Sequence, residues 1–263
     1  MSVNRLAIRL CTVQALTNQT MAGGRVYDSQ IRPVDEVAKE EPRPFIAVYT
    51  DDAAIPANGK NLAMESGTVD LVIEYAVATV VQAEVDGGVE VQVPDTDAGF
   101  EITLDLIERQ IFRALMAGQS VWAEHWRRFS VELSSVTSKR GSESINGLRF
   151  AARQIKITLG LLAEPAFGQE LSPTGAWSRL LADMRAQPDL SALANLLQSE
   201  IEAPDLHSWQ KAQASLGATN EEGRSLGFPP AYPAGGGPDE APPVDQITVD
   251  GFEINASTAA ESP

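Results

Sequence analysis

The sequence predicts an α/β fold of the α+β kind, with a mixed, mostly antiparallel sheet flanked by helices. Two observations lead to this prediction. The stretch Thr68–Val81 alternates large apolar residues with polar or small ones, which is the period of a strand. The stretch that follows Asp97 repeats apolar residues every three or four positions, the period of a helix with one apolar face: Phe100, Leu104, Ile107, Ile111 and Leu115.

The N-terminal segment 3–20 also has a helical period, with its apolar stripe at Leu6, Leu10, Val13 and Leu16. We expect this helix to end at the pair Gly23-Gly24, because glycine commonly follows the last turn of a helix. The chain then continues as a short strand, a polar connection bounded by prolines and a second strand, at Val26–Tyr27, Pro33–Arg43 and Phe45–Thr50.

The central strand Thr68–Val81 is expected to follow a turn at Asn58-Gly59. Asp86-Gly87-Gly88 predicts a hairpin, with Val89–Val93 as the return strand. Asp95-Thr96-Asp97 then caps the long helix, which we expect to end at Gly118. Acidic residues in its first turn and arginines nearer its end suit the helix dipole.

Two more strands are predicted, at Phe129–Thr137 and Arg149–Ala163. The polar residues between them, which include Lys139 and Arg140, are predicted to form a loop. That loop is long for a hairpin, so we expect it to be mobile or held by a partner.

The pattern changes after Pro165. Helices are predicted from Ser172-Pro173, over Leu190–Ile201, and from Pro204-Asp205. A Pro/Gly-rich stretch at 228–245 has the composition of a disordered linker, and Ile247–Ile254 has the pattern of a small hairpin. The expected organisation is therefore an α/β domain, a helical extension and an extended arm, at residues 1–163, 164–216 and 217–263.

Composition narrows the classes of function. The chain of 263 residues has a net charge of −16, and residues 164–263 hold 15 acidic against 4 basic side chains. Overall acidity disfavours binding to nucleic acid phosphates. No apolar run is long enough to span a membrane, and the N-terminus lacks the apolar region of a signal peptide. The single cysteine, Cys11, excludes an internal disulfide and suits a reducing cytoplasm.

One segment departs from the acidic balance. Between Arg109 and Lys156 lie nine basic residues and three acidic ones. The segment is interpreted either as a solvated helix face and hairpin or as one side of a charge-complementary contact between copies.

An enzyme is disfavoured. His125 and His207 lack a metal-ligand partner at helical spacing, and Cys11 has the pattern of a buried, inert thiol. Asp28 with Asp51-Asp52 could hold a cation, but adjacent carboxylates on an extended chain point to opposite faces. We therefore expect Asp51-Asp52 to be a solvated strand end that opens a loop. No catalytic residue, metal ligand or cofactor is predicted.

The order of elements over residues 1–163 resembles the tail terminator proteins of long-tailed bacteriophages. The segments that carry the resemblance are AGGRVYDSQIRPVD, PFIAVYTDD and GLRFAARQIKITLGLL, together with the long alternating strand and the helix between them. Typical members end near the last of these strands, so residues 164–263 are an extension to the family pattern.

The resemblance implies a non-catalytic subunit of a homohexameric ring on the head-proximal end of the tail tube. Such a ring stops tube polymerisation and joins the tail to the neck proteins of the head, and DNA passes through its lumen. The resemblance implies a location in the host cytoplasm during assembly and then in the virion, with no membrane. The expected partners are other copies of the chain, the tail tube protein and the head–neck connector.

Interface residues follow as hypotheses. Basic residues and the apolar residues of the hairpin are expected at a subunit or ring interface: Lys139, Arg140, Arg149, Arg153, Lys156, Ile247, Val249, Phe252 and Ile254. Acidic residues are expected on the ring or channel surface: Asp51, Asp52, Asp70, Glu74 and Glu90. The hairpin is also expected to add strands to a neighbour's sheet edge, because a two-stranded hairpin is marginally stable alone.

Three alternatives stay open. The chain could be another neck component, such as a head–tail connector or head completion protein. It could be a metal-dependent enzyme that uses Asp28, Asp51 and Asp52, or a bacterial structural protein with no phage role.

Overall fold

The protein is an α+β fold built on a five-stranded mixed sheet, as predicted. The computed structural model describes residues 2–29, 43–56, 60, 66–80, 97–145, 148–227, 246–249 and 252–255. The strand order is β1-β2-β3-β5-β4, with β1 parallel to β2 and the other pairs antiparallel. The strands are β1 (Val26–Asp28), β2 (Phe45–Ala54), β3 (Thr68–Val80), β4 (Ser130–Ile145) and β5 (Leu148–Leu161).

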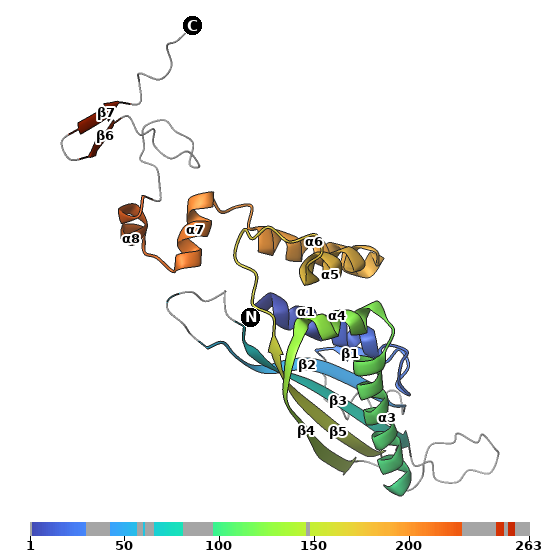
Figure 1. Ribbon diagram of the computed structural model, residues 1–263. Helices are drawn as coiled ribbons and strands as arrows, with labels where there is room; N and C mark the ends of the chain where they lie inside the picture. Colours follow the sequence, from blue (N-terminus) through green and yellow to red (C-terminus); the bar gives the residue numbers. More distant parts are fainter. Residues whose placement is uncertain are drawn as a thin grey trace, which may run out of the picture.

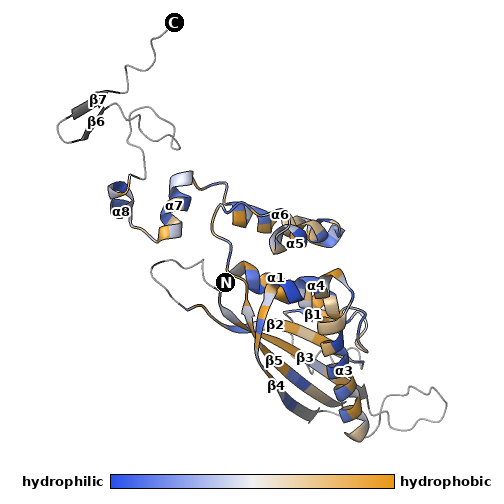
Figure 2. Ribbon diagram, viewed as in Figure 1, coloured by the Kyte–Doolittle hydropathy of each residue, from blue (hydrophilic) through white to orange (hydrophobic). Residues whose placement is uncertain are grey.

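Three helices cover one face of this sheet (Figure 1). They are α1 (Ser2–Leu16), α3 (Asp97–Ala117) and α4 (Val121–Phe129). The core lies between these helices and the inward residues of the strands, and Figure 2 shows apolar residues along β2 and β3 beneath the helices. From β3 the core takes Val69, Leu71, Ile73, Tyr75 and Val77, the residues whose alternation predicts this strand.

The helices of the predicted extension pack onto the same core. These are α5 (Ala176–Arg185) and α6 (Pro188–Glu202), which lie over α4 (Figure 1). The Trp177 ring meets the Phe129 ring edge-on at a centroid distance of 5.0 Å, and both are buried. On the same contact, the buried His125 Nε2 lies 2.6 Å from Asp183 Oδ2. The extension therefore begins as a docked helical layer.

Two short helices continue the chain, α7 (Ser208–Leu216) and α8 (Asn220–Ser225). Helix α8 lies beyond the last helix predicted from the sequence. Farther along, β6 (Gln246–Val249) and β7 (Phe252–Asn255) form a separate two-stranded sheet, which confirms the predicted hairpin. The predicted turns at Asn58-Gly59 and Asp86–Gly88, the return strand Val89–Val93 and most of the Pro33–Arg43 connection lie outside the described residues.

Several predicted boundaries are wrong. Helix α1 ends at Leu16, because Asn18 enters the left-handed region at φ 60° and its amide donates to Gly23 O. The glycine pair was the expected end, but asparagine also tolerates this conformation. In the extension, α5 begins at Ala176 and α7 at Ser208, three or four residues after the predicted starts.

Helix α4 was not among the helices predicted from the sequence. Its N-cap is Ser120, whose hydroxyl accepts a hydrogen bond from Ala123 N at 3.1 Å. Trp122 and Trp126, one turn apart, are both buried. The capping serine followed by aromatic residues at helical spacing was the signal that could have identified this helix.

The predicted loop around Lys139 and Arg140 is a strand. β4 pairs with β5 as far as Ile145 and Leu148, leaving only two residues between the strands. Backbone hydrogen bonds to β5 hold this polar segment extended, and an edge strand tolerates polar side chains because they reach solvent. β2 likewise continues to Ala54 through an irregularity between Thr50 and Ala53. Asp51 and Asp52 are exposed near the end of the strand, as expected, but β2 continues two residues beyond them before the loop begins.

The contact between Trp177 and Phe129 should account for much of the stability of the extension. We expect Trp177→Ala to lower the free energy of unfolding by about 3–5 kcal/mol, because it empties a buried aromatic site. Denaturant titration followed by circular dichroism measures this change. The matched control is Leu196→Ala, since Leu196 on α6 is 57% exposed. Equal small losses in both variants would contradict the docking.

Candidate interaction surfaces

Two of the predicted acidic residues, Asp70 and Glu74, lie on the face of the sheet opposite the helices, which we call the outer face. Its polar side chains are Tyr49, Asp70, Glu74, Gln154, Lys156 and Thr158. Asp70 accepts hydrogen bonds from Lys156 Nζ at 2.8 Å and from Thr158 Oγ1 at 2.6 Å. Glu74 accepts from Tyr49 Oη and from Gln154 Nε2, each at 2.7 Å. These side chains form two closed polar groups across β2, β3 and β5.

The electrostatics of the outer face match these contacts. Partial burial opposes ionisation of Asp70, but the hydrogen bonds from Lys156 and Thr158 outweigh it and hold the pKa of Asp70 below its usual value. Burial and the neighbouring Glu74 carboxylate raise the pKa of Tyr49, so its hydroxyl stays protonated as a donor. Asp70 and Glu74 are therefore occupied within the chain, whereas Asp51 and Asp52 on β2 are exposed.

A second cluster occupies the opposite side of the sheet, beneath α3. Arg153 on β5 contacts Asp105 at 2.6 Å, Glu101 at 2.9 Å and Glu108 at 3.3 Å. Glu101 also binds Arg140 at 2.5 Å. Arg140, Arg153 and Lys156, which were predicted at an interface between copies, thus have carboxylate partners within the same chain. Only their remaining exposed surface is available to a neighbour.

The strand β4 is the most exposed strand among the described residues. It is 16 residues long and, in the described sheet, hydrogen-bonds only to β5. All ten residues from Val131 to Arg140 are exposed, on both faces of the strand. Three of them are large and apolar: Val131 at 63%, Leu133 at 47% and Val136 at 51%. We call Val131–Arg140 the β4 edge.

The remaining predicted residues are placed by their strand or not at all. Glu90 lies outside the described residues. Arg149 lies in β5, where the backbone pairs it with Ser144 and Thr79. The hairpin residues pair as Ile247 with Ile254 and Val249 with Phe252. Lys139 lies within the β4 edge and is exposed.

The groups most often used in catalysis lie apart from one another. Cys11 is fully buried in α1, and burial raises the pKa of its thiol, which keeps it protonated. His125 belongs to the contact between α4 and α5, and His207 is the N-cap of α7. Asp28 pairs with Arg9 at 2.5 Å. Within the described residues, no three His, Cys, Asp or Glu side chains gather as a metal site.

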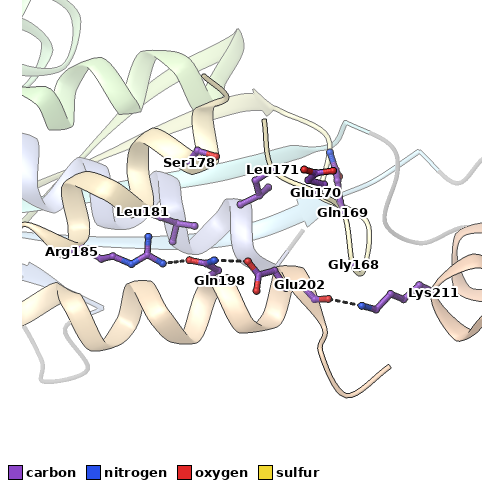
Figure 3. Close-up of a pocket in the computed structure, with 10 residues that line it drawn as sticks. All are labelled: Gly168, Gln169, Glu170, Leu171, Ser178, Leu181, Arg185, Gln198, Glu202 and Lys211. Atoms are coloured by element: carbon purple, nitrogen blue, oxygen red, sulfur yellow. Dashed lines mark hydrogen bonds between the residues drawn. The ribbon is translucent and has the colours of Figure 1, made fainter. Parts of the chain in front are cut away.

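A polar hollow of about 500 Å³ opens between residues 168–171 and helices α5 and α6 (Figure 3). Its polar groups bind one another. Arg185 donates to Asn195 and Gln198, Gln198 donates to Glu202, and Lys211 Nζ donates to Glu202 O at 3.0 Å. The hollow therefore reads as a hydrogen-bonded junction between helices.

Comparisons with known proteins do not supply a family. No protein-family model matches the chain, and no curated protein matches its sequence. In the described part of the chain, no helix has both the length and the apolar character to cross a membrane. Function has to be inferred from the residues and their arrangement.

The Arg153 cluster predicts a specific dependence of stability on pH. Arg140 and then Arg153 hold the pKa of Glu101 below its ordinary value of 4.5. A carboxyl whose pKa is lower in the folded state stabilises the fold above that ordinary value, and this contribution is lost as pH falls below it. Arg153→Gln should lower the free energy of unfolding at neutral pH by about 2 kcal/mol. It should also flatten the loss of stability below the ordinary pKa.

Urea unfolding at neutral pH and at about pH 3 measures both effects. The control is Arg179→Gln, because Arg179 is exposed and donates to a backbone oxygen, Thr174 O. A variant at Arg153 with the same slope against pH as the parent protein would contradict the proposed ion pairs.

Proposed function

We propose that this chain is a structural subunit of a bacteriophage ring, the tail terminator that caps the head-proximal end of the tail tube. The observation that carries the proposal is the β4 edge. A long exposed edge strand with apolar side chains is an aggregation hazard unless another chain covers it. A closed ring repeats the same interface between every pair of neighbours, so an interface at the β4 edge would cover that edge in every copy.

The extent of the sequence resemblance supports the same proposal. Residues 1–163 contain the whole five-stranded sheet and the three helices that cover it. The segments that carry the resemblance include all of β1, most of β2 and all of β5, and the long alternating strand is β3. These four strands are neighbours in one sheet. The resemblance thus coincides with a complete structural layer rather than with scattered pieces.

The charge distribution suits a channel through which DNA passes without being held. Asp51 and Asp52 are exposed on β2, whereas Arg153 and Lys156 are tied to carboxylates. A surface with acidic groups and few available cations cannot release counterions from the DNA phosphates. Under the proposal, Asp51 and Asp52 face the channel or a ring surface, and the chain performs no catalysis.

The partners follow from the role. In addition to other copies of the chain, the ring would bind the tail tube protein on one side and the head–neck connector on the other. The protein would assemble in the host cytoplasm and remain in the virion at the tail–neck junction.

Ring formation is tested by placing a charge on the β4 edge. We expect Val136→Glu to abolish or weaken assembly by at least tenfold in protein concentration, about 1.4 kcal/mol or more, because a desolvated carboxylate at an interface is costly. Light scattering with multi-angle detection measures the mass. The matched control is Leu196→Glu on α6, another exposed apolar site. A parent protein that stays monomeric, including with tail tubes present, would count against the ring.

The position in the virion is tested in tails assembled without this chain. If it is the terminator, electron microscopy should show tubes that exceed the normal length, because nothing stops their polymerisation. Headless tails of normal length would instead identify a head–tail connector. Tails of normal length with heads attached would overturn both assignments. Restoring the parent protein is the control.

A further inference from the structure

The structure leaves two sets of backbone hydrogen-bonding groups without strand partners in the described sheets. One is the edge of β4 that lies away from β5, since in the described sheet β4 pairs only with β5. The other is the hairpin β6–β7, whose strands pair only with each other. A two-stranded hairpin is marginal in water, and an edge strand is a template for further pairing. Each of these two features supplies what the other lacks.

We propose that the hairpin β6–β7 of one copy adds to the β4 edge of the neighbouring copy. This inference rests on the proposed ring, and it names the segment that covers the edge. The added strand would gain backbone hydrogen bonds to β4 and cover part of Val131, Leu133 and Val136, as in other cases of strand addition.

The residue pattern of the hairpin suits this position. Its ladder alternates two apolar pairs, Ile247–Ile254 and Val249–Phe252, with the polar pairs Gln246–Asn255 and Thr248–Glu253. Residues paired across an antiparallel ladder share a face, so one face of the hairpin is apolar and the other polar. The β4 edge could pack against both faces of the hairpin, because exposed apolar side chains lie beside exposed polar ones along it.

Charge points to the same pairing. Residues 228–263 hold six acidic side chains and no lysine or arginine. Two of the acids, Asp250 and Glu253, lie at the hairpin itself. The β4 edge, Val131–Arg140, holds Lys139 and Arg140 against one acid, Glu132, and Arg140 is also bound to Glu101. An acidic arm beside this basic stretch gains favourable electrostatic energy and is steered towards it.

The chain is long enough to reach a neighbour. The 18 residues at 228–245 separate the end of the helical extension from β6. Fully extended, they span up to about 60 Å at roughly 3.3 Å per residue. A domain of this size has a radius of gyration of about 15 Å, so the arm can reach past one subunit. In the single chain, the hairpin forms a sheet of its own apart from β4, so the partner edge is assigned to a second copy.

Disulfide trapping tests the contact directly. One copy carries a tag and Ser134→Cys, Val136→Cys or Ser138→Cys, and the other copy carries Val249→Cys. The native Cys11 does not interfere, because it is buried and its thiol is held protonated. Mixed copies under mild oxidation should form tagged–untagged dimers. The yield should exceed that of a Gln19→Cys control by about tenfold, since a disulfide needs Cα atoms within roughly 7 Å.

The outcomes separate the contact from the ring, whose mass is measured by light scattering on the same samples before oxidation. If the samples have the mass of a ring but give no more disulfide-linked dimer than the control at any of the three β4 positions, the contact is overturned and the proposed ring stands. A variant that carries both Val136→Cys and Val249→Cys in one chain, and links only within that chain, assigns the hairpin to its own β4 and also overturns the contact. Absence of both ring and dimer overturns the proposed function as well.

Discussion

The antiparallel ladder between β3 and β5 determines where the other parts of the molecule lie. It runs in unbroken register from Thr68 opposite Gly160 to Val80 opposite Leu148. Because residues alternate along a strand, this register sends Leu71 with Ile157 to the helical side and Asp70 with Thr158 to the outer side. A slip of one residue would exchange the two faces. The same ladder places β4 at the end of the sheet, where its outer side has no further described strand.

The sequence could predict the parts of the fold that one periodic pattern specifies. β3 and α3 were found with nearly correct bounds, because a strand with two buried neighbours and a helix on a core need regular apolar spacing. The later half of β4 could not be found in this way. Its segment Ser138–Ile145 is polar at almost every position, and the backbone pairs it with β5 along its whole length. Pairing of this kind is decided by the partner strand.

The partners of the charged residues could not be predicted from the sequence either. A run of basic residues in an acidic chain indicates that the cations have partners, but not whether those partners lie in the same chain. Arg153 meets Glu101, Asp105 and Glu108, which precede it by about fifty residues and come from α3. Their approach depends on the packing of that helix over β5. The exposed apolar residues of β4 were equally hidden in the sequence, because a strand pattern does not distinguish an edge from a centre.

The docked helices α5 and α6 give the C-terminal arm a fixed origin. Trp177 against Phe129 and His125 against Asp183 hold the start of the extension to the sheet domain. His125 Nδ1 is buried without a hydrogen-bond partner in the described structure, so the described hydrogen bond of this ring is the one between Nε2 and Asp183. An arm tethered at a fixed point samples a limited volume, which raises its effective concentration at any site within reach. In the proposed ring that site would recur on each neighbour, so a weak contact by a short hairpin, repeated around the ring, would add to the stability of the whole assembly.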